Sequence, residues 1–172
     1  MTKTGSGDGT AGAPLVIRPA GPADAEALAP LVRALALFDG KGDVSHLTPA
    51  TVADWLAGPS PAFDAVIALA DGEALGYAAF YRAFSLYKGS PVMLLENLYV
   101  TEVARKRGVG RRLVAAVAAE AKRRGYQRME LHVTMTNRPT RAFYERIGLE
   151  APGEAVYRIE DGALAQLADE EA

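Results

Sequence analysis

The chain has 172 residues, 49% of them hydrophobic, which suits one domain with a substantial core. Its net charge of −2 gives no general attraction to nucleic acid, and no run of about 20 apolar residues predicts a membrane span. We therefore expect neither kind of partner. The absence of cysteine excludes disulfides and a cysteine nucleophile, and His46 and His132 are too few for a multi-histidine metal site, so no metal is expected.

The N-terminal segment Met1–Pro14 is rich in glycine, threonine and alanine and lacks the pattern of a signal peptide. We expect it to be a disordered tail that precedes a single domain over residues 15–172. The missing signal peptide and the missing cysteines favour a cytoplasmic protein.

The first part of the chain predicts a strand and two helices. Leu15–Arg18 reads as a short strand that Pro19 stops. Asp24–Phe38 carries apolar residues at helical spacing, with Asp24 as its cap. Thr48 is expected to cap a second helix that begins at Pro49.

Three strands are predicted next, in hairpin succession. They are Ala65–Leu69, Ala74–Phe84 and Val92–Thr101. Asp71-Gly72 is a hairpin turn signal between the first two.

The last part predicts two more helices and two more strands. Gly110–Arg124 reads as a helix that Gly125 ends, and Arg128–Val133 as a strand. Pro139–Ile147 is a short helix, and Ala155–Ile159 is expected to be the last strand. This order predicts an α/β protein with a mixed sheet flanked by helices. The path from Val92–Thr101 through a helix to Arg128–Val133 is a candidate right-handed crossover between parallel strands.

The segment Arg105–Gly110 lies between a strand and a helix. A glycine-rich turn that opens a helix exposes unpaired backbone N–H groups, which form a site for a phosphate or pyrophosphate. The segment lacks the Gly-Lys-Ser/Thr of a Walker loop, and Leu113 stands where a dinucleotide loop has its third glycine. A plain turn without a ligand is the alternative.

Together with a motif further along, this loop resembles that of the GNAT superfamily of acetyl-CoA-dependent N-acetyltransferases. Arg105, Gly108 and Gly110 match the acyl-CoA loop of the family, and Asn137 and Tyr144 match its downstream motif. The resemblance covers about residues 15–160 and implies a mostly antiparallel central sheet. Within the superfamily the chain looks most similar to the spermidine/spermine (diamine) acetyltransferases.

The resemblance implies which residues hold the co-substrate acetyl-CoA. Backbone groups of the loop would surround the pyrophosphate, and the strand at Leu98–Val100 would pair with the pantetheine arm. The alternatives are that the basic residues form a solvated face and that Asn137 is a helix cap, a role compatible with cofactor binding. The predicted acetyl-CoA contacts are Leu98, Tyr99, Val100, Arg105, Lys106, Arg107, Gly108, Val109, Gly110, Arg111, Asn137 and Tyr144.

Two of the matched residues are candidates for catalysis. The Tyr144 phenol is suited to protonating the departing thiolate, although a core aromatic is the alternative. Glu96 lies in an apolar strand, where a carboxylate is costly unless it faces a cleft or has a partner. The resemblance makes Glu96 a base or a contact for the substrate amine. A structural ion pair with Arg82 or Arg158 is the alternative.

The acceptor is expected to be a primary amine of a small molecule. Asp39, Glu96, Tyr81 and Tyr87 are the predicted substrate-binding residues. The loop after Asp39 is less acidic and less aromatic than in the polyamine enzymes, so a short diamine or a lysine-like amino acid also fits. A protein acetyltransferase and a non-catalytic acyl-CoA-binding module are the other hypotheses. The resemblance further implies a homodimer.

Overall fold

The computed structural model describes residues 14–153 and 156–169. The chain divides into two compact units, Met1–His132 and Val133–Ala172. The predicted tail Met1–Pro14 lies outside the described residues except for Pro14, and it stays a prediction, as does the single domain.

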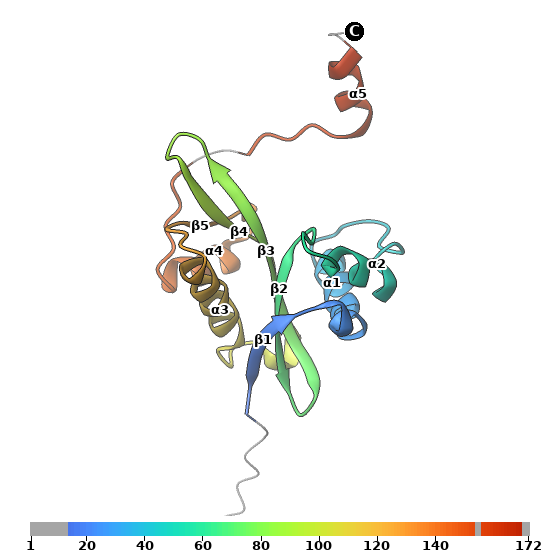
Figure 1. Cartoon of the computed structure of the whole chain (residues 1–172), viewed down its shortest axis with the longest axis vertical. Helices are drawn as coiled ribbons and strands as arrows, with labels where there is room; N and C mark the ends of the chain where they lie inside the picture. The colour runs from blue at the N-terminus through green and yellow to red at the C-terminus, as the bar shows by residue number, and fades with distance from the viewer. Residues whose placement is uncertain (1–13, 154–155, 170–172) are drawn as a thin grey trace, which may run out of the picture. The chain divides into compact units, whose positions relative to one another are not determined.

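The first unit contains one sheet with the strand order β1-β2-β3-β4-β5 (Figure 1). Neighbouring strands are antiparallel except β4 and β5, which are parallel and joined through a helix, so the mostly antiparallel mixed sheet is confirmed. The strands are β1 (Val16–Ala20), β2 (Asp64–Ala70), β3 (Glu73–Ser85), β4 (Ser90–Val100) and β5 (Met129–Leu131).

Helices lie on both sides of this sheet. On one side are α1 (Ala25–Phe38) and α2 (Pro49–Leu56), and on the other is α3 (Val109–Arg123) (Figure 1). Successive side chains of a strand point to opposite faces of the sheet, so apolar residues can pack against helices on both faces. Ile67 and Tyr77 are buried against α1 and α2. On the other face, α3 contributes the buried residues Leu113, Val114 and Val117. The second unit contains α4 (Arg138–Arg146) and α5 (Asp161–Asp169). None of the helices in the described ranges is both long and apolar enough to cross a bilayer.

Two predicted local signals are confirmed. Thr48 caps α2 by accepting a hydrogen bond from the backbone N–H of Thr51 (3.2 Å). Asp71 and Gly72 both have positive φ, 51° and 78°, and form the turn between β2 and β3.

The N-terminal strand and the first helix cap differ from prediction. Pro19 lies within β1, paired with Val66, and does not stop the strand. A proline is tolerated there because β1 is an edge strand and the missing N–H breaks no second ladder. Asp24 stands at the N-cap position of α1, but its carboxylate accepts hydrogen bonds from Arg18 (2.6 and 2.9 Å) and from the N–H of Gly21 (3.0 Å). It therefore ties β1 to the helix entry.

The predicted last strand is wrong. Ala155 lies outside the described residues, and residues 156–160 form neither strand nor helix. Val156 and Tyr157 are exposed, and no strand of the described residues pairs with them. β-Branched and aromatic residues favour a strand, but a strand is stable only when its backbone pairs with a neighbouring strand. The short helix α5 follows, which the sequence pattern did not predict.

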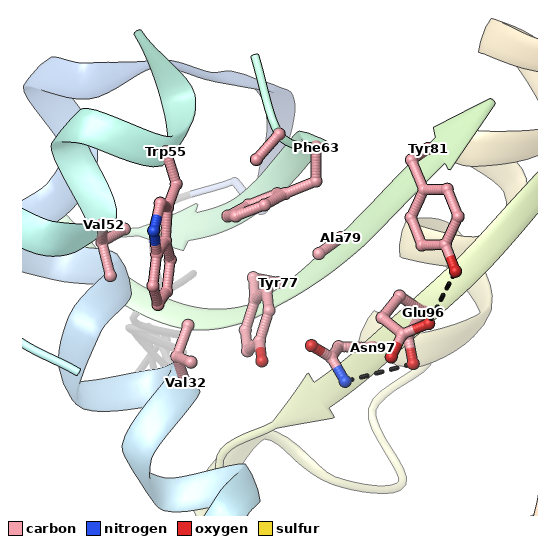
Figure 2. Close-up of a pocket in the computed structure, with 10 residues that line it drawn as sticks. Val32, Val52, Trp55, Phe63, Tyr77, Ala79, Tyr81, Glu96 and Asn97 are labelled. Atoms are coloured by element: carbon pink, nitrogen blue, oxygen red, sulfur yellow. Dashed lines mark hydrogen bonds between the residues drawn. The ribbon is translucent and has the colours of Figure 1, made fainter. Parts of the chain in front are cut away.

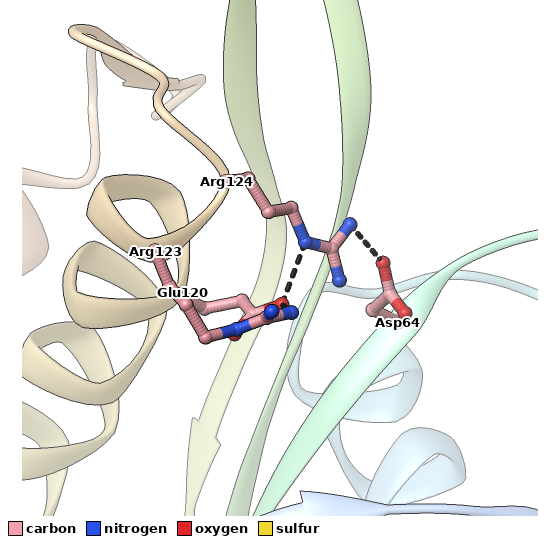
Figure 3. Close-up of polar contacts among 4 residues, drawn as sticks. All are labelled: Asp64, Glu120, Arg123 and Arg124. Carbon is pink, nitrogen blue, oxygen red and sulfur yellow. Dashed lines mark hydrogen bonds and ion pairs between the residues drawn. The ribbon is translucent and has the colours of Figure 1, made fainter.

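The C-terminal end of α3 is attached to β2 by a cluster of charges (Figure 3). Arg124 donates to Asp64 of β2 (2.7 Å) and to Glu120 of α3 (2.6 Å). Arg123 donates to both carboxylate oxygens of Glu120, at 2.6 and 2.7 Å. The hydrogen bonds from Arg123, followed by the one from Arg124, lower the pKa of Glu120 to about 2.

Candidate active site

A β-bulge interrupts β4 at Glu96. Ala79 of β3 pairs with Asn97, but the next residue, Phe80, pairs with Leu95, so Glu96 is an extra residue without a partner in the ladder. On a regular strand, neighbouring residues face opposite sides of the sheet. The bulge instead lets Glu96 and Asn97 line the same pocket.

The bulge also marks the point where β4 loses its outer neighbour. β5 pairs with β4 only from Met93 to Leu95. The N–H of Thr101 donates to the Leu75 carbonyl of β3 (2.9 Å), and antiparallel pairs alternate. Because the direction alternates from residue to residue, Tyr99, two residues before Thr101, also bonds to β3. Leu98 and Val100 therefore direct their backbone groups to the outer edge of β4. That edge has no strand partner among the described residues.

The pocket beside the bulge has a volume of about 280 Å³ and mostly apolar walls. Helices α1 and α2 contribute Val32, Val52 and Trp55 (Figure 2). Phe63, from the segment before β2, packs edge to face on Trp55 with ring centroids 6.4 Å apart. The two rings form one aromatic wall.

Strands β3 and β4 supply the rest of the lining, including its polar groups. Tyr77, Ala79 and Tyr81 follow one another at every second position of β3. The Tyr81 hydroxyl donates to Glu96 Oε2 at 3.4 Å (Figure 2). Burial, together with the charge of Glu96, raises the pKa of Tyr81, so its hydroxyl stays protonated.

Glu96 has no ion-pair partner among the described residues. Arg158 pairs with Glu160, and Arg82 lies over the ring of Phe84. The alternative of a structural ion pair with either arginine therefore has no support, and the carboxylate is exposed at the pocket.

The predicted anion loop leads directly into α3. The helix begins at Val109, and its N-cap is Gly108, which has a φ of 80° and no side-chain cap. Lys106 also has a positive φ, 61°. An added Cβ at Gly108 would meet nothing within 4 Å, so one side of the loop is open. Uncapped N–H groups at the start of a 15-residue helix suit a pyrophosphate.

The Arg105 side chain points back toward the sheet. Its Nε donates to the carbonyl of Val100 (3.1 Å), and its guanidinium lies 5.2 Å from the ring centre of Phe38 and 5.9 Å from that of Tyr99. Cation–π contacts on two rings hold it in this position. It joins the end of α1 to the end of β4.

The second unit holds the two residues of the downstream motif. Asn137 is the N-cap of α4 and accepts from the N–H of Thr140 (3.2 Å), as the cap alternative proposed. Tyr144 is buried and packs edge to face on Phe143. Burial raises the pKa of Tyr144 to about 12, so the phenol keeps its proton at neutral pH.

Of the predicted substrate-binding residues, Glu96 and Tyr81 meet at the pocket, while Asp39 and Tyr87 are not part of its lining. Asp39 is exposed after α1, and Tyr87 is 97% exposed between β3 and β4. Trp55, Phe63 and Tyr77 also line the pocket but were not predicted as site residues, because their apolar spacing is equally typical of a core. The described residues contain no group of three or more side chains arranged to hold a metal.

Comparisons with known proteins agree on one family. Residues 31–149 match the family model of the acetyltransferase (GNAT) family. The chain is similar to the thialysine N-epsilon-acetyltransferase of Bos taurus, with 27% identity over 90% of this chain and 97% of that protein. It is also similar to a tyramine N-feruloyltransferase of Nicotiana tabacum, with 34% identity over 56% of this chain and 43% of that protein.

A solved structure of an aminoglycoside N-acetyltransferase in complex with CoA is similar to this chain. The TM-score is 0.73 and the identity 25%, over 88% of this chain and 97% of that one. The family match spans well over half of the chain, and the fold agrees with it. The chain therefore belongs to the acetyltransferase (GNAT) family and is an acyltransferase.

Proposed function

We propose that this acyltransferase moves the acetyl group of acetyl-CoA directly to the primary amine of a small molecule, with both substrates bound together. The observation that carries the proposal is the bulge at Glu96, which gives a small pocket its carboxylate beside an unpaired strand edge. The relatives are named for different amine acceptors, and one neighbour is in complex with CoA.

The donor would be held by the backbone. The open loop and uncapped start of α3 fit the pyrophosphate, with exposed Lys106, Arg107 and Arg111 adding positive charge. The outward backbone groups of Leu98 and the N–H of Val100 fit the amides of a pantetheine arm, as an added strand would, while the Val100 carbonyl already accepts from Arg105. The resemblance adds Val109, Gly110 and Asn137. We expect the backbone N–H groups of the loop to contribute more to pyrophosphate binding than the side chain of Arg105, because the Arg105 guanidinium already donates to the Val100 carbonyl.

The acceptor would enter the pocket with its ammonium toward Glu96. The carboxylate attracts the ammonium ion and takes a proton from it, directly or through water, which leaves the neutral amine as nucleophile. The Tyr81 hydroxyl keeps Glu96 oriented by its hydrogen bond. The volume of about 280 Å³ is near the lower end of small-molecule sites, which favours a small acceptor over a protein chain.

Tyr144 is the proposed proton donor for the departing thiolate. A phenol that stays protonated at neutral pH has its hydrogen available as negative charge develops on sulfur. Asp39 and Tyr87 remain predicted substrate contacts, and they would act only on an acceptor that reaches beyond the pocket lining.

Thiol release from acetyl-CoA tests the proposal. The acceptor panel contains monoamines, diamines, polyamines, lysine analogues and a lysine peptide, and each acetylated product is identified by mass spectrometry. We expect release with at least one small amine. Release with the peptide alone would favour a protein acetyltransferase. Binding of CoA without release across the panel would favour a non-catalytic module.

A cytoplasmic homodimer is also proposed. The cysteine-free composition supports the location. Exposed apolar side chains near the C-terminus support self-association, namely Val156, Tyr157, Leu164 and Leu167.

A further inference from the structure

The side chains of the pocket restrict the acceptor to a narrower class of amines than membership of the family implies. Glu96 is the only acidic residue among its lining residues, and the opposite part of the lining is Trp55 and Phe63 (Figure 2). Asp39 lies outside the lining, and its charge acts on the pocket by adding to burial in raising the pKa of Tyr77. A second ammonium group within the pocket would lose its water without gaining a carboxylate of the lining, which is unfavourable. The pocket therefore matches a molecule with one charged end and one apolar end.

The aromatic wall suits a ring more than an alkyl chain. Trp55 and Phe63 are fixed edge to face, and Val32 and Val52 complete an apolar surface beside them. A planar ring can pack on such a corner by edge-to-face or offset contacts, whereas an alkyl chain gains only buried area. The preference for an aromatic amine over an alkyl amine should therefore exceed the difference that buried apolar area alone would give.

One polar group in the pocket has no partner. The Tyr77 hydroxyl is buried and makes no hydrogen bond with any described residue. Figure 2 shows it directed away from Trp55, on the side where Val32 and Asn97 lie. Buried hydroxyl groups are nearly always hydrogen-bonded, so this one is suited to a polar substituent of a ligand.

We propose that the acceptor is an arylalkyl monoamine with a polar ring substituent, whose ammonium meets Glu96, whose ring packs on Trp55 and Phe63, and whose substituent bonds to Tyr77. This inference rests on the proposed acetyl transfer and deepens it. The transfer forms the amide N–C bond and breaks the thioester C–S bond. The ammonium ion gives one proton to Glu96 before the attack. The thiolate leaves as a thiol with the proton proposed to come from Tyr144, which is replaced by the second proton that the amine loses.

The test compares acceptors of similar length by kcat/KM: 2-phenylethylamine, its 4-hydroxy and 3-hydroxy derivatives, pentylamine, 1,4-diaminobutane and spermidine. We expect the best arylalkylamine to exceed pentylamine and both polyamines by about ten-fold or more. The Trp55→Ala variant should remove most of that difference. The matched control is Asp54→Ala, an exposed neighbour on α2 outside the pocket lining, which should retain it.

Tyr77→Phe tests the hydroxyl separately, because it keeps the ring and the packing. We expect about a five-fold loss of kcat/KM for the preferred hydroxylated amine and no loss for 2-phenylethylamine. Thermal unfolding of the variant verifies that it folds.

The outcomes separate this inference from the proposed function. A preference for 1,4-diaminobutane, spermidine or pentylamine would overturn the inference and leave acetyl transfer intact. An equal loss for both arylalkylamines in Tyr77→Phe would overturn the role of the hydroxyl. Failure to acetylate any amine, with acetyl-CoA still bound in calorimetry, would overturn the proposed function and this inference with it.

Discussion

At the scale of single residues, the role of Glu96 depends on the backbone that carries it. Most residues around Glu96 in the sequence are apolar and predict that it lies in an apolar strand. A carboxylate in such a strand needs a cleft or a charged partner. The bulge provides the cleft, and Tyr81 is the only described side chain that hydrogen-bonds to the Glu96 carboxylate. The Asn97 side chain donates to the backbone carbonyl of Glu96 instead (3.1 Å).

Glu96→Gln should keep the shape of the pocket and remove its charge. We expect kcat/KM for the amine to fall by about ten-fold or more, with a shifted pH–rate profile, because the amide neither accepts the proton nor attracts the ammonium ion. Initial rates from pH 6 to pH 10 measure this. Glu73→Gln, an exposed glutamate at the start of β3, is the control. An unaltered profile would argue for a structural role.

Tyr144→Phe should keep the packing on Phe143 and remove the proton donor. We expect kcat to fall by about ten-fold or more with little change in acetyl-CoA affinity, measured by steady-state kinetics and calorimetry. Tyr157→Phe, at an exposed position of the same unit, should behave like the wild type. Unchanged turnover would leave Tyr144 as a core aromatic.

At the scale of elements, the approach of β3 to β4 depends on Gly76. A Cβ at this position would lie 2.5 Å from the carbonyl oxygen of Tyr99 and 3.2 Å from the Cα of Val100, both backbone atoms. Gly76→Ala should therefore cost about 1–3 kcal/mol of unfolding free energy. Urea denaturation measures this, with Gly42→Ala, where a Cβ meets nothing within 4 Å, as the control. Equal stability of the two variants would contradict the expected clash.

The charge cluster of Asp64, Glu120, Arg123 and Arg124 should make the attachment of α3 depend on pH. Because the pKa of Glu120 is lowered from 4.5 to about 2, its stabilisation is complete above pH 4.5 and is lost as the pH falls toward 2. Glu120→Gln should cost about 1–2 kcal/mol at pH 7, a modest value since Arg123 is exposed.

The difference between Glu120→Gln and the wild type should shrink steadily in urea denaturation between pH 5 and pH 3. Glu73→Gln, which lies outside the ion pairs of the described residues, should show no such trend. A difference independent of pH would mean that packing, and not charge, stabilises this end of α3.

At the scale of the whole molecule, the sequence predicted the sheet and its helices because their apolar spacing is regular. The loop before α3 was also predictable, since two glycines such as Gly108 and Gly110 at the start of a helix are typical of an anion-binding loop. The bulge was not, because an extra residue in a strand leaves no mark in composition. Trp55, Phe63 and Tyr77 were missed for a related reason: whether an aromatic side chain lines a pocket or fills a core depends on packing between distant segments.

Self-association is the prediction that belongs to this scale. We expect sedimentation velocity to give a dimer at micromolar concentration, because several apolar side chains of the C-terminal segment are exposed. Leu164→Lys combined with Leu167→Lys should shift the protein toward the monomer, whereas the same change at exposed Leu86 should not. A wild-type monomer at all concentrations would contradict the proposal.

The bulge makes the carboxylate of the pocket a separate addition to an otherwise regular strand. Deleting Glu96 would join Leu95 directly to Asn97, and Phe80 would keep its pairing with Leu95 and Ala79 its pairing with Asn97. The backbone groups of Leu98 would still face the outer edge, whereas the carboxylate would be gone. A loss of one codon would thus remove the proposed contact of the acceptor and leave the strand edge that is proposed for the donor.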